Sequence, residues 1–529
     1  MFSPMLGEAP LWTGFIFFVG GIVLLIVGYM TYGRFVERVL QPDDRETPAV
    51  KYADGVDYVV LPHWKNMLIQ LLNIAGIGPV IGVIAGIKFG AIVFILIPIG
   101  NIIGGATHDF IAGMASLRNR GGNLPGFIKI TLGNGLYFFF SVFMVFLLLL
   151  VVAVFINVPA KLFDVSIFPN CQFFWPAIGL IFLYYILATM FPVDKIIGKL
   201  YPIFGGILLL GSLALLAALL KSGVQDPSIL LESEKFSGLK SGFLQDHPLI
   251  PCLFVTIACG ILSGFHATQA PIIARTMKSE RQARSSFYGM MIVEGIIAMI
   301  WAGAALAVYN IHFASGDQDI WQLSANAFLP IITTDFLGSG LGTVTVIAVI
   351  ILAITSGDTA MRSLRLSLAE IFHIDQKPVL NRILLCIPLI ISIAVLLHWS
   401  NKDAASFGKL WNYFAWGNQV LAVFTLGAGC VWLYAKKRAG WISALPCLYM
   451  TFIVVSFILW TSSEHKGPAG FGLDYKLSCQ IAGVVAVVFV AWCVVRGLRI
   501  AKNGGKGMEY VDPNDSNETT QTAGKTESK

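Results

Sequence analysis

The sequence predicts an all-α membrane protein of about thirteen transmembrane helices, in which two five-helix blocks face opposite ways. Three observations support this: the composition, the number of long apolar runs, and the alternation of basic loops. Of the 529 residues, 56% are hydrophobic, only 12% are charged, and the mean hydropathy is +0.76. A soluble domain carries about 25% charged residues. The composition therefore excludes a soluble enzyme, a disordered protein and a secreted disulfide scaffold.

The apolar runs are long enough to cross a bilayer, because a helix spanning about 30 Å of hydrocarbon needs roughly 20 apolar residues. They cover residues 12–32, 64–87, 90–116, 135–156, 173–191, 201–220, 249–274, 286–311, 341–372, 380–398, 411–435, 441–461 and 477–496. We expect the first run to remain as a membrane helix. No basic residue precedes it, and it lacks the small-x-small cleavage site of a signal peptide.

Basic residues lie in alternate loops, which predicts an orientation in the membrane. The loop after the first span holds Arg34, Arg38 and Arg45, whereas residues 312–340 contain no Lys or Arg. Short loops rich in Lys and Arg face the cytoplasm, so in a bacterial inner membrane the N-terminus is predicted outside and the C-terminus in the cytoplasm. The net charge of +6 lies in these loops and indicates membrane orientation, not nucleic-acid binding. The cysteines form no CxxC pair, so no zinc site or disulfide framework is predicted.

Apolar runs and polar stretches divide the chain into six segments. They are an N-terminal helix with a cytoplasmic loop (1–63), a first five-helix block (64–220), an external loop (221–248), a second five-helix block (249–435), two C-terminal helices (436–502) and a polar tail (503–529) expected to be disordered. Within the second block, residues 320–337 have the pattern of an external helix and turn. We expect this segment to act as an outer gate.

Three spans are interrupted by residues that a membrane helix tolerates only where other groups satisfy its backbone. The interruptions are residues 73–82 in the second span, 259–271 in the seventh and 355–359 in the ninth. The first two each open a block of five spans, and an odd number of helices gives the blocks opposite orientations. This is the pattern of an inverted repeat whose broken helices meet at a central binding site. The alternative is that Gly and Pro are simply commoner in membrane helices.

The first two interruptions are predicted to form the substrate site, because half-helix N-termini offer unpaired N–H groups to a carboxylate. The candidate substrate-binding residues are Asn73, Gly76, Gly78, Pro79, Gly260, Ser263, Gly264, His266 and Gln269. The ring of His266 is expected in the unwound stretch, where it would donate to an anionic substrate or carry a proton. A structural role is the alternative for this histidine.

Ionisable groups inside the spans are costly and usually serve a transport pathway or an ion pair. The candidates for ion or proton coupling are His108, Asp109, Glu294, Thr355, Ser356, Asp358 and Thr359. Oxygens of Thr355, Ser356 and Asp358, with carbonyls freed by a broken helix, suit a Na⁺ ion or a proton. A buried pair between Asp358 and Arg362 is the alternative. No cofactor is predicted other than the coupling ion, H⁺ or Na⁺.

Glu294 and Asp109 are the other carboxylates within spans. Glu294 lies among apolar residues and is a candidate proton carrier, with a hydrogen bond to a neighbouring helix as the alternative. Asp109 follows His108 near the cytoplasmic end of the third span. The alternative to a coupling role for Asp109 is an ion pair with Arg118 or Arg275.

Five stretches carry a family resemblance: LLNIAGIGPVIGVIAGIKFG, GGATHDFIAGMASLRNRGGNLPGFI, TIACGILSGFHATQAPIIARTMKSE, TSGDTAMRSLRLSLAE and WNYFAWGNQVLAVFTL. Over roughly 54–435 the chain resembles the carbon starvation protein A family of peptide and pyruvate transporters. The resemblance implies the LeuT-like fold of the amino acid–polyamine–organocation superfamily and proton-driven uptake when carbon is short. It departs from the family at 67–76, where longer relatives carry an HHFAAIAGAGP-type stretch, so a histidine pair is absent. Asp109 matches the acidic residue of an AVQDF-type motif, with His108 in place of Gln.

The predicted function is a secondary transporter, not an enzyme, that imports a small carboxylate such as pyruvate, or a short peptide, with H⁺. Its predicted partners are the small-molecule substrate and the lipid bilayer. The alternatives are a Na⁺-coupled amino acid or peptide transporter and a nutrient sensor that binds without transport. An intramembrane aspartyl protease using Asp109 and Asp358 is disfavoured, because the first glycine of a GxGD motif and the Tyr-Asp partner are missing.

Overall fold

The computed structural model describes residues 12–55, 57–169, 171–190, 193–231, 247–314, 323–376, 378–462, 470–504 and 508, without the side chains of 193–202, 204 and 404–405. These residues form helices and turns, and none of them lies in a strand. Most of the predicted external loop 221–248 and nearly all of the predicted tail 503–529 lie outside this part of the chain, as do residues 320–322 of the predicted outer gate.

The prediction of an all-α membrane protein is confirmed. In the described part, ten helices are long and apolar enough to span a membrane, and one bent pair, His63–Ile74 with Gly78–Phe89, makes an eleventh span. The predicted fifth span is the shorter apolar helix α10 (Phe174–Met190), and the predicted seventh span is divided into short pieces. Apolar runs become helices because backbone polar groups in lipid must be satisfied within the segment.

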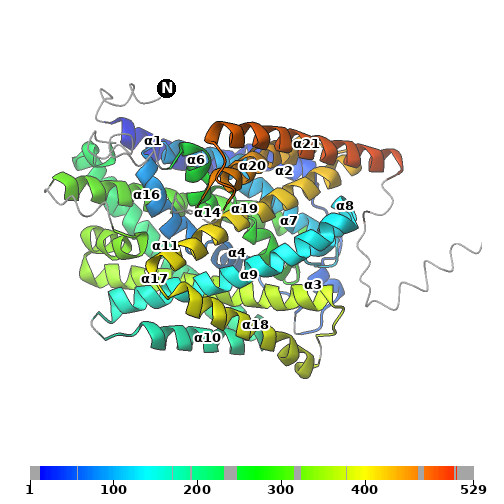
Figure 1. Ribbon diagram of the computed structural model, residues 1–529, viewed down its shortest axis with the longest axis horizontal. Coiled ribbons are helices and arrows are strands. Elements are labelled where there is room, and N and C mark those ends of the chain that lie inside the picture. Colours follow the sequence, from blue (N-terminus) through cyan, green and yellow to red (C-terminus); the bar gives the residue numbers. More distant parts are fainter. Residues whose placement is uncertain are drawn as a thin grey trace, which may run out of the picture.

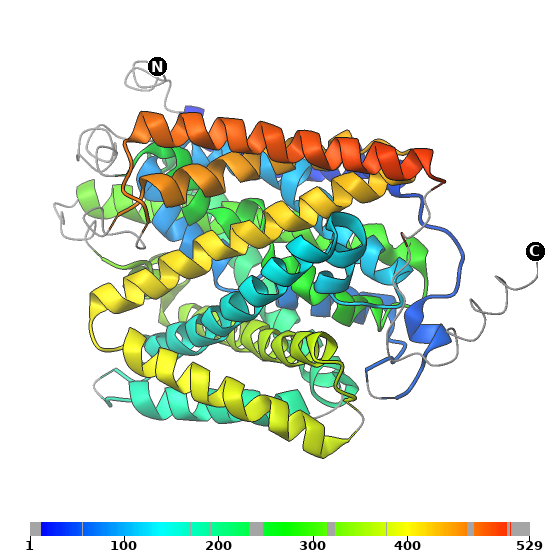
Figure 2. The ribbon, with the colours of Figure 1, turned by 45° about the vertical axis from the view of Figure 1, so that its right-hand side comes forward.

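Most of the principal helices follow the predicted spans, whereas two short helices, at residues 32–40 and 124–132, lie in segments predicted as cytoplasmic loops. The principal helices are α1 (Thr13–Met30), α2 (Tyr32–Leu40), α4 (His63–Ile74), α6 (Val93–Gly100), α7 (Ala106–Arg118), α8 (Leu124–Leu132), α9 (Asn134–Leu162), α11 (Val193–Gln225), α16 (Met290–Ala314), α17 (Ala325–Ile371), α18 (Val379–Ser400), α19 (Ala404–Ala435), α20 (Trp441–Trp460) and α21 (Tyr475–Lys502). Figures 1 and 2 show α20 and α21 along one flank of the bundle and α10 and α18 along the opposite flank. The broken segments, including α4 and α14 (Ala258–Ile261), lie between these flanks in Figure 1.

The second span is broken where the sequence predicts it. Helix α4 ends at Ile74, residues 75–77 lie outside any helix, and the π-helix η1 (Gly78–Gly82) resumes the span at an angle of 53°. Pro79 has no amide hydrogen to continue the ladder of α4. The break therefore leaves backbone groups unpaired by the helix itself.

The seventh span is also broken, into η6 (Leu249–Leu253), α13 (Phe254–Thr256), α14 and α15 (Phe265–Ala274). The backbone is extended at Leu262, with φ −165° and ψ 115°. The unwound stretch is 262–264, so His266 lies in the first turn of α15 and not in the unwound stretch as the sequence predicted. The helix restarts early because Asn418 of α19 caps it, accepting from the amide of Phe265 at 2.6 Å.

The predicted interruption at residues 355–359 is wrong. This stretch is continuous helix within α17, which instead kinks at Gly338, where φ is 71°. A single glycine does not break a helix whose remaining hydrogen bonds are intact, and Thr355 and Thr359 direct their hydroxyls to carbonyls of their own helix. Residues 325–337 form the helix predicted for the outer segment, and the turn lies at Gly338.

Several loops predicted to be cytoplasmic meet on one face of the bundle. Arg118, after α7, pairs with Glu280 at 2.9 Å, and Arg438, after α19, donates to the carbonyl of Leu40 at 2.5 Å. The loops after the first, third, seventh and eleventh predicted spans thus share one face, as the alternation of basic loops requires.

Candidate functional site

The two broken spans touch each other inside the bundle. A Cβ atom added at Gly78 would lie 2.1 Å from the Cβ atom of Cys259. One added at Gly82 would lie 2.9 Å from the carbonyl oxygen of Thr256. No side chain fits at 2.1 Å, so glycine at residue 78 is what allows the two breaks to come this close. The freed backbone groups of both breaks therefore lie in one small region, as the sequence predicted.

Asn418 holds the second break in its unwound form. Besides the amide of Phe265, its Oδ1 atom accepts from the hydroxyl of Ser263 at 3.2 Å, and its carbonyl accepts from the amide of Gly264 at 3.2 Å. These bonds replace helix bonds that the break removes. Asn418 was not among the residues predicted from the sequence. The available signal was an amide pair, Asn418-Gln419, inside an apolar span.

Buried polar atoms without partners surround the breaks. Both side-chain polar atoms of Asn73, which is 0% exposed, lack a hydrogen-bond partner in the described structure, as does Oε1 of Gln269. Leaving such a group unsatisfied costs on the order of 1–3 kcal/mol. Each of these groups calls for a partner such as water, an ion or a ligand. They lie beside the first break and in α15, which leads from the second break to the loop predicted to be cytoplasmic.

A line of ionisable side chains connects three helices beside the second break. The carboxylate of Asp109 on α7 lies 2.8 Å from Nδ1 of His108 and 2.9 Å from Nδ1 of His266 on α15. On the other side of the His266 ring, Nε2 lies 3.6 Å from Oε2 of Glu294 on α16. All four side chains are at most 1% exposed. The order His108–Asp109–His266–Glu294 suits proton sharing, because each member is a donor or acceptor for the next.

These contacts exclude the alternative considered for Asp109, an ion pair with an arginine. Its partners are the two histidines, not Arg118 or Arg275: Arg118 pairs with Glu280, and Arg275 donates to the carbonyl of Gly121 at 2.8 Å. Asp109 lies in the first turn of α7, about two and a half turns before its end, too deep in the bundle for the arginines at the face predicted to be cytoplasmic.

The third span is shaped to bring Asp109 against the second break. Just before α7 the chain forms the π-helix η3 (Asn101–Gly105), and the Asn101 amide donates to the carbonyls of Gly260 at 3.1 Å and Met291 at 2.9 Å. A Cβ atom at Gly105 would lie 2.3 Å from the carbonyl oxygen of Ile261. The asparagine therefore satisfies a carbonyl freed by the break, and the glycine allows the close approach.

The side chains around Asp358 contact two different neighbours of α17. The hydroxyl of Ser356 donates to the carbonyl of Leu72, near the end of α4, at 2.8 Å. Tyr184 of α10 donates to Oδ2 of Asp358 at 3.3 Å, and Arg362 donates to the carbonyl of Ala188 at 2.8 Å. Asp358 is 0% exposed. Because residues two apart in a helix point to different sides, Ser356 faces the first break and Asp358 faces α10.

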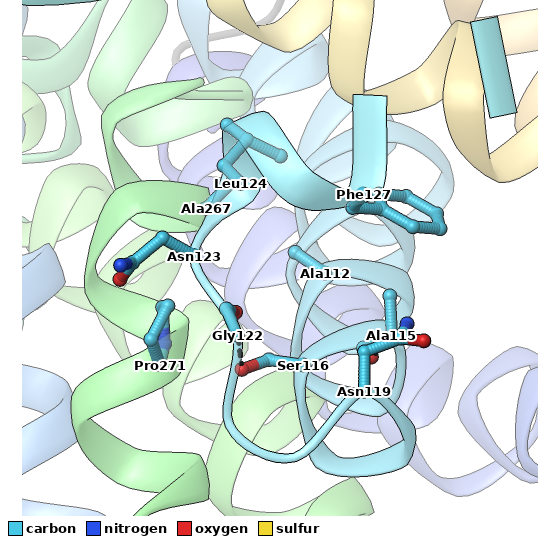
Figure 3. A pocket seen from close by; sticks show the side chains of 10 residues that line it. All are labelled: Ala112, Ala115, Ser116, Asn119, Gly122, Asn123, Leu124, Phe127, Ala267 and Pro271. Atoms are coloured by element: carbon cyan, nitrogen blue, oxygen red, sulfur yellow. Dashed lines mark hydrogen bonds between the residues drawn. The ribbon is translucent and has the colours of Figure 1, made fainter. Parts of the chain in front are cut away.

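A small cavity lies on the cytoplasmic side of the second break. Figure 3 shows Pro271 and Ala267 of α15 facing the turn that follows α7, where Ser116 donates to the carbonyl of Gly122 at 3.0 Å. The cavity holds about 10 Å³, enough for one water molecule. This cavity is therefore too small for a molecule larger than water.

The structure gathers the predicted site residues into two groups. Around the contact of the two breaks lie Asn73, Gly76, Gly78, Pro79, Gly260, Ser263, Gly264, His266 and Gln269, with His108, Asp109 and Glu294 beside the second break. The second group lies on α17, where Ser356 contacts the end of α4 and Asp358 contacts Tyr184 of α10. Thr355 and Thr359 bond to their own helix, with the hydroxyl of Thr355 donating to the carbonyl of Leu352 at 2.9 Å. Tyr184 is a contact that the sequence did not indicate.

Comparison with known sequences gives consistent matches. The family model described as carbon starvation protein CstA matches residues 13–174, 175–327 and 325–456. An uncharacterized membrane protein of Haemophilus influenzae is 39% identical over 338 residues, 55% of this chain and 90% of that protein. A protein of Helicobacter pylori named peptide transporter CstA is 27% identical over 369 residues, 57% of this chain and 52% of that protein. The chain therefore spans about half the length of that transporter.

Two solved structures share the fold. A variant of the Eremococcus coleocola manganese transporter has a TM-score of 0.54 at 13% identity, covering 85% of this chain and 99% of that one. MhsT in complex with L-phenylalanine has a TM-score of 0.52 at 14% identity, covering 83% of this chain and 99% of that one. At such identities the likeness concerns the fold alone, and the fold is LeuT-like, as predicted.

Proposed function

Because the chain belongs to the carbon starvation protein CstA family, we propose that it is a secondary transporter that imports a small carboxylate or a short peptide together with H⁺. The family match and the LeuT-like fold support transport, and relatives named peptide transporter support the substrate class. The substrate would bind between the two breaks and be exposed to each side of the membrane in turn.

The observation that carries the proposal is the contact between two broken spans at residues that leave polar groups unsatisfied. Gly78 meets Cys259 across the breaks, and the amide of Asn73 has no partner although it is fully buried. A carboxylate would accept from the side-chain amide of Asn73, which lies at the end of α4 beside the first break.

The proton would be carried by His266 and Glu294. With Nδ1 of His266 directed at Asp109, its Nε2 atom is the one available to exchange a proton with Glu294. A hydrogen bond requires about 3 Å, so the present 3.6 Å separation closes with a shift of roughly half an ångström. Movement of α15 during the transport cycle would make and break this contact, which couples proton transfer to the state of the break.

Na⁺ is the alternative coupling ion, and one observation favours it. Asp358 is a fully buried carboxylate that accepts from Tyr184, and a carboxylate suits Na⁺ as well as a proton. In this case Asp358 would bind the ion and the His266–Glu294 pair would be structural.

Uptake into proteoliposomes tests the proposal. We expect labelled pyruvate or alanyl-alanine to accumulate under an inward proton gradient, and Glu294→Gln to reduce this accumulation at least tenfold. Asp375→Asn, outside the membrane spans, is the matched control and should transport normally. Accumulation driven only by an inward Na⁺ gradient would identify Na⁺, and not H⁺, as the coupling ion. Binding without accumulation under either gradient would contradict transport and identify a sensor.

A further inference from the structure

A second cavity lies away from the two breaks, where α9, α10, α18 and α19 converge. It has a volume of about 390 Å³, within the range of roughly 300–1,000 Å³ found for small-molecule sites. The turns that line it belong to loops after the fourth and tenth predicted spans, which the alternation of basic loops assigns to the outside. Neither the family match nor the transport site at the breaks accounts for this cavity.

The floor of the cavity is polar, buried and rigid. Asn157 of α9 is 2% exposed and Ser400 of α18 is 0% exposed. The Asn157 amide donates to the hydroxyl of Ser400 at 3.2 Å, and its Oδ1 accepts from Asn401 at 2.6 Å. Because the floor residues hold each other in place, the cavity keeps its shape without an occupant.

The walls carry charges of both signs beside aromatic rings. Lys161 and Asp164 follow Asn157 along α9 and η4 (Phe163–Ile167), and Asp403 begins α19. Three rings complete the lining: Phe174, Trp175 and Phe407. An ammonium and carboxylates at one rim suit a molecule that itself carries a carboxylate and an ammonium. The rings suit an apolar side chain between them.

We infer that this cavity, formed by Asn157, Lys161, Asp164, Trp175, Asp403 and Phe407, is an outer binding site for a zwitterion, an amino acid or short peptide, distinct from the site at the breaks. Lys161 binds its carboxylate, the Asp164 and Asp403 carboxylates bind its ammonium, and the rings cover its side chain. A simple anion such as pyruvate lacks the ammonium and binds there more weakly.

The helix that carries the cavity floor also packs against both breaks. The centroid of the Phe155 ring, two residues before Asn157 on α9, lies 5.9 Å from that of Phe265 at the start of α15 and 5.9 Å from that of Phe414 on α19. A Cβ atom at Gly76 would meet the Phe155 ring at 2.8 Å.

The test is photo-cross-linking of the purified full-length protein with alanyl-photoleucine, a dipeptide with a diazirine side chain, followed by mapping of the labelled peptides. We expect labelling within 157–175 and 400–407 that excess alanyl-leucine suppresses and excess pyruvate does not. Lys161→Gln should weaken this labelling about fivefold, which is the loss of affinity expected when a well-placed ion pair near the surface is removed. Lys409→Gln, the same change at an exposed lysine of α19 outside the cavity, should leave it unchanged.

Labelling requires no transport, so its outcome is independent of the uptake experiment. Labels confined to the two broken spans, or equal labelling in Lys161→Gln and the wild type, would overturn the outer site while leaving the transport site intact. Suppression by pyruvate as effective as that by alanyl-leucine would overturn the assignment of a zwitterion.

Discussion

Nδ1 of His266 lies 2.9 Å from Oδ2 of Asp109, and both side chains are 1% exposed. This contact joins the second broken span to the neighbouring α7, so the geometry of the break depends on a buried pair. Removing one partner of such a pair leaves a charge or a donor unsatisfied in a medium that solvates it poorly.

Asp109→Asn should therefore destabilise the protein, because the carboxylate accepts from two imidazole rings at once. Breaking a buried pair costs about 3–5 kcal/mol. The midpoint of thermal unfolding in detergent, followed by intrinsic fluorescence, should fall by several degrees. Asp335→Asn, at a partly exposed carboxylate, is the control. A midpoint for Asp109→Asn equal to that of the control would show that the contact contributes little.

Glu294→Gln should keep the shape of the site, but the glutamine cannot exchange a proton with His266. Uptake driven by a proton gradient should fall at least tenfold, and its dependence on pH between 5 and 8 should flatten. Substrate exchange across a membrane without a gradient should persist, since it needs no net proton movement. Uptake with a wild-type pH profile would remove Glu294 from the coupling mechanism.

Asp43→Asn provides the control for that pH profile. The Arg45 guanidinium, hydrogen-bonded to Asp43 outside the membrane, holds the pKa of this carboxyl below its usual range. A depressed pKa contributes stability that is present above the unfolded value, about 3.9, and is lost only as pH falls towards the folded value. Asp43 therefore stays ionised from pH 5 to 8, and Asp43→Asn should keep the wild-type profile.

Gly78→Ala should displace the two breaks, because the new methyl group would lie 2.1 Å from the Cβ atom of Cys259. Overpacking of this kind costs about 1–3 kcal/mol and should reduce uptake at least tenfold. Gly206→Ala, where no atom lies within 4 Å, should be neutral. The double variant Gly78→Ala with Cys259→Gly removes the clash and should recover most of the uptake. Failure of this rescue would contradict the close approach.

Arg118 and Glu280 should show strong coupling in a double-mutant cycle of thermal unfolding. Their side chains are 4% and 1% exposed, and Glu280 also accepts from the backbone of Asp43 at 2.9 Å. Exposed ion pairs couple by about 0.2–1 kcal/mol, whereas buried contacts reach 0.5–3 kcal/mol. We expect a value above about 1 kcal/mol for this pair. Additive effects of Arg118→Ala and Glu280→Ala would mean that the two side chains do not hold this face together.

Much of the fold is visible in the sequence because lipid imposes a simple rule. A run of apolar residues must be a helix, and Gly and Pro in corresponding positions mark the breaks at 73–82 and 259–271. The same rule gave a wrong prediction, a helix break, at residues 355–359. There Thr355 and Ser356 resemble a break in composition, but without a proline the helix ladder stays complete.

The site was predicted as a set of residues but not as a set of contacts. His108, Asp109, His266 and Glu294 each stood out as an ionisable group inside a span. Their order in one line depends on the rotation of three helices, to which the π-helix at Asn101 contributes. Asn418 and Tyr184 were not predicted for the same reason. A single polar residue in a span does not reveal which neighbouring helix its side chain contacts until the packing of the helices is known.

We propose that substrate binds where the two broken spans meet, and Asn73→Ala probes this site. Both polar atoms of this buried side chain lack partners, so the change removes a ligand without breaking an internal bond. In proteoliposomes we expect Asn73→Ala to raise the KM for pyruvate or alanyl-alanine at least tenfold, with an unchanged unfolding midpoint. Asn381→Ala, at a more accessible side chain bonded to a backbone carbonyl, serves as the control. An unchanged KM and maximal rate in Asn73→Ala would contradict the claim.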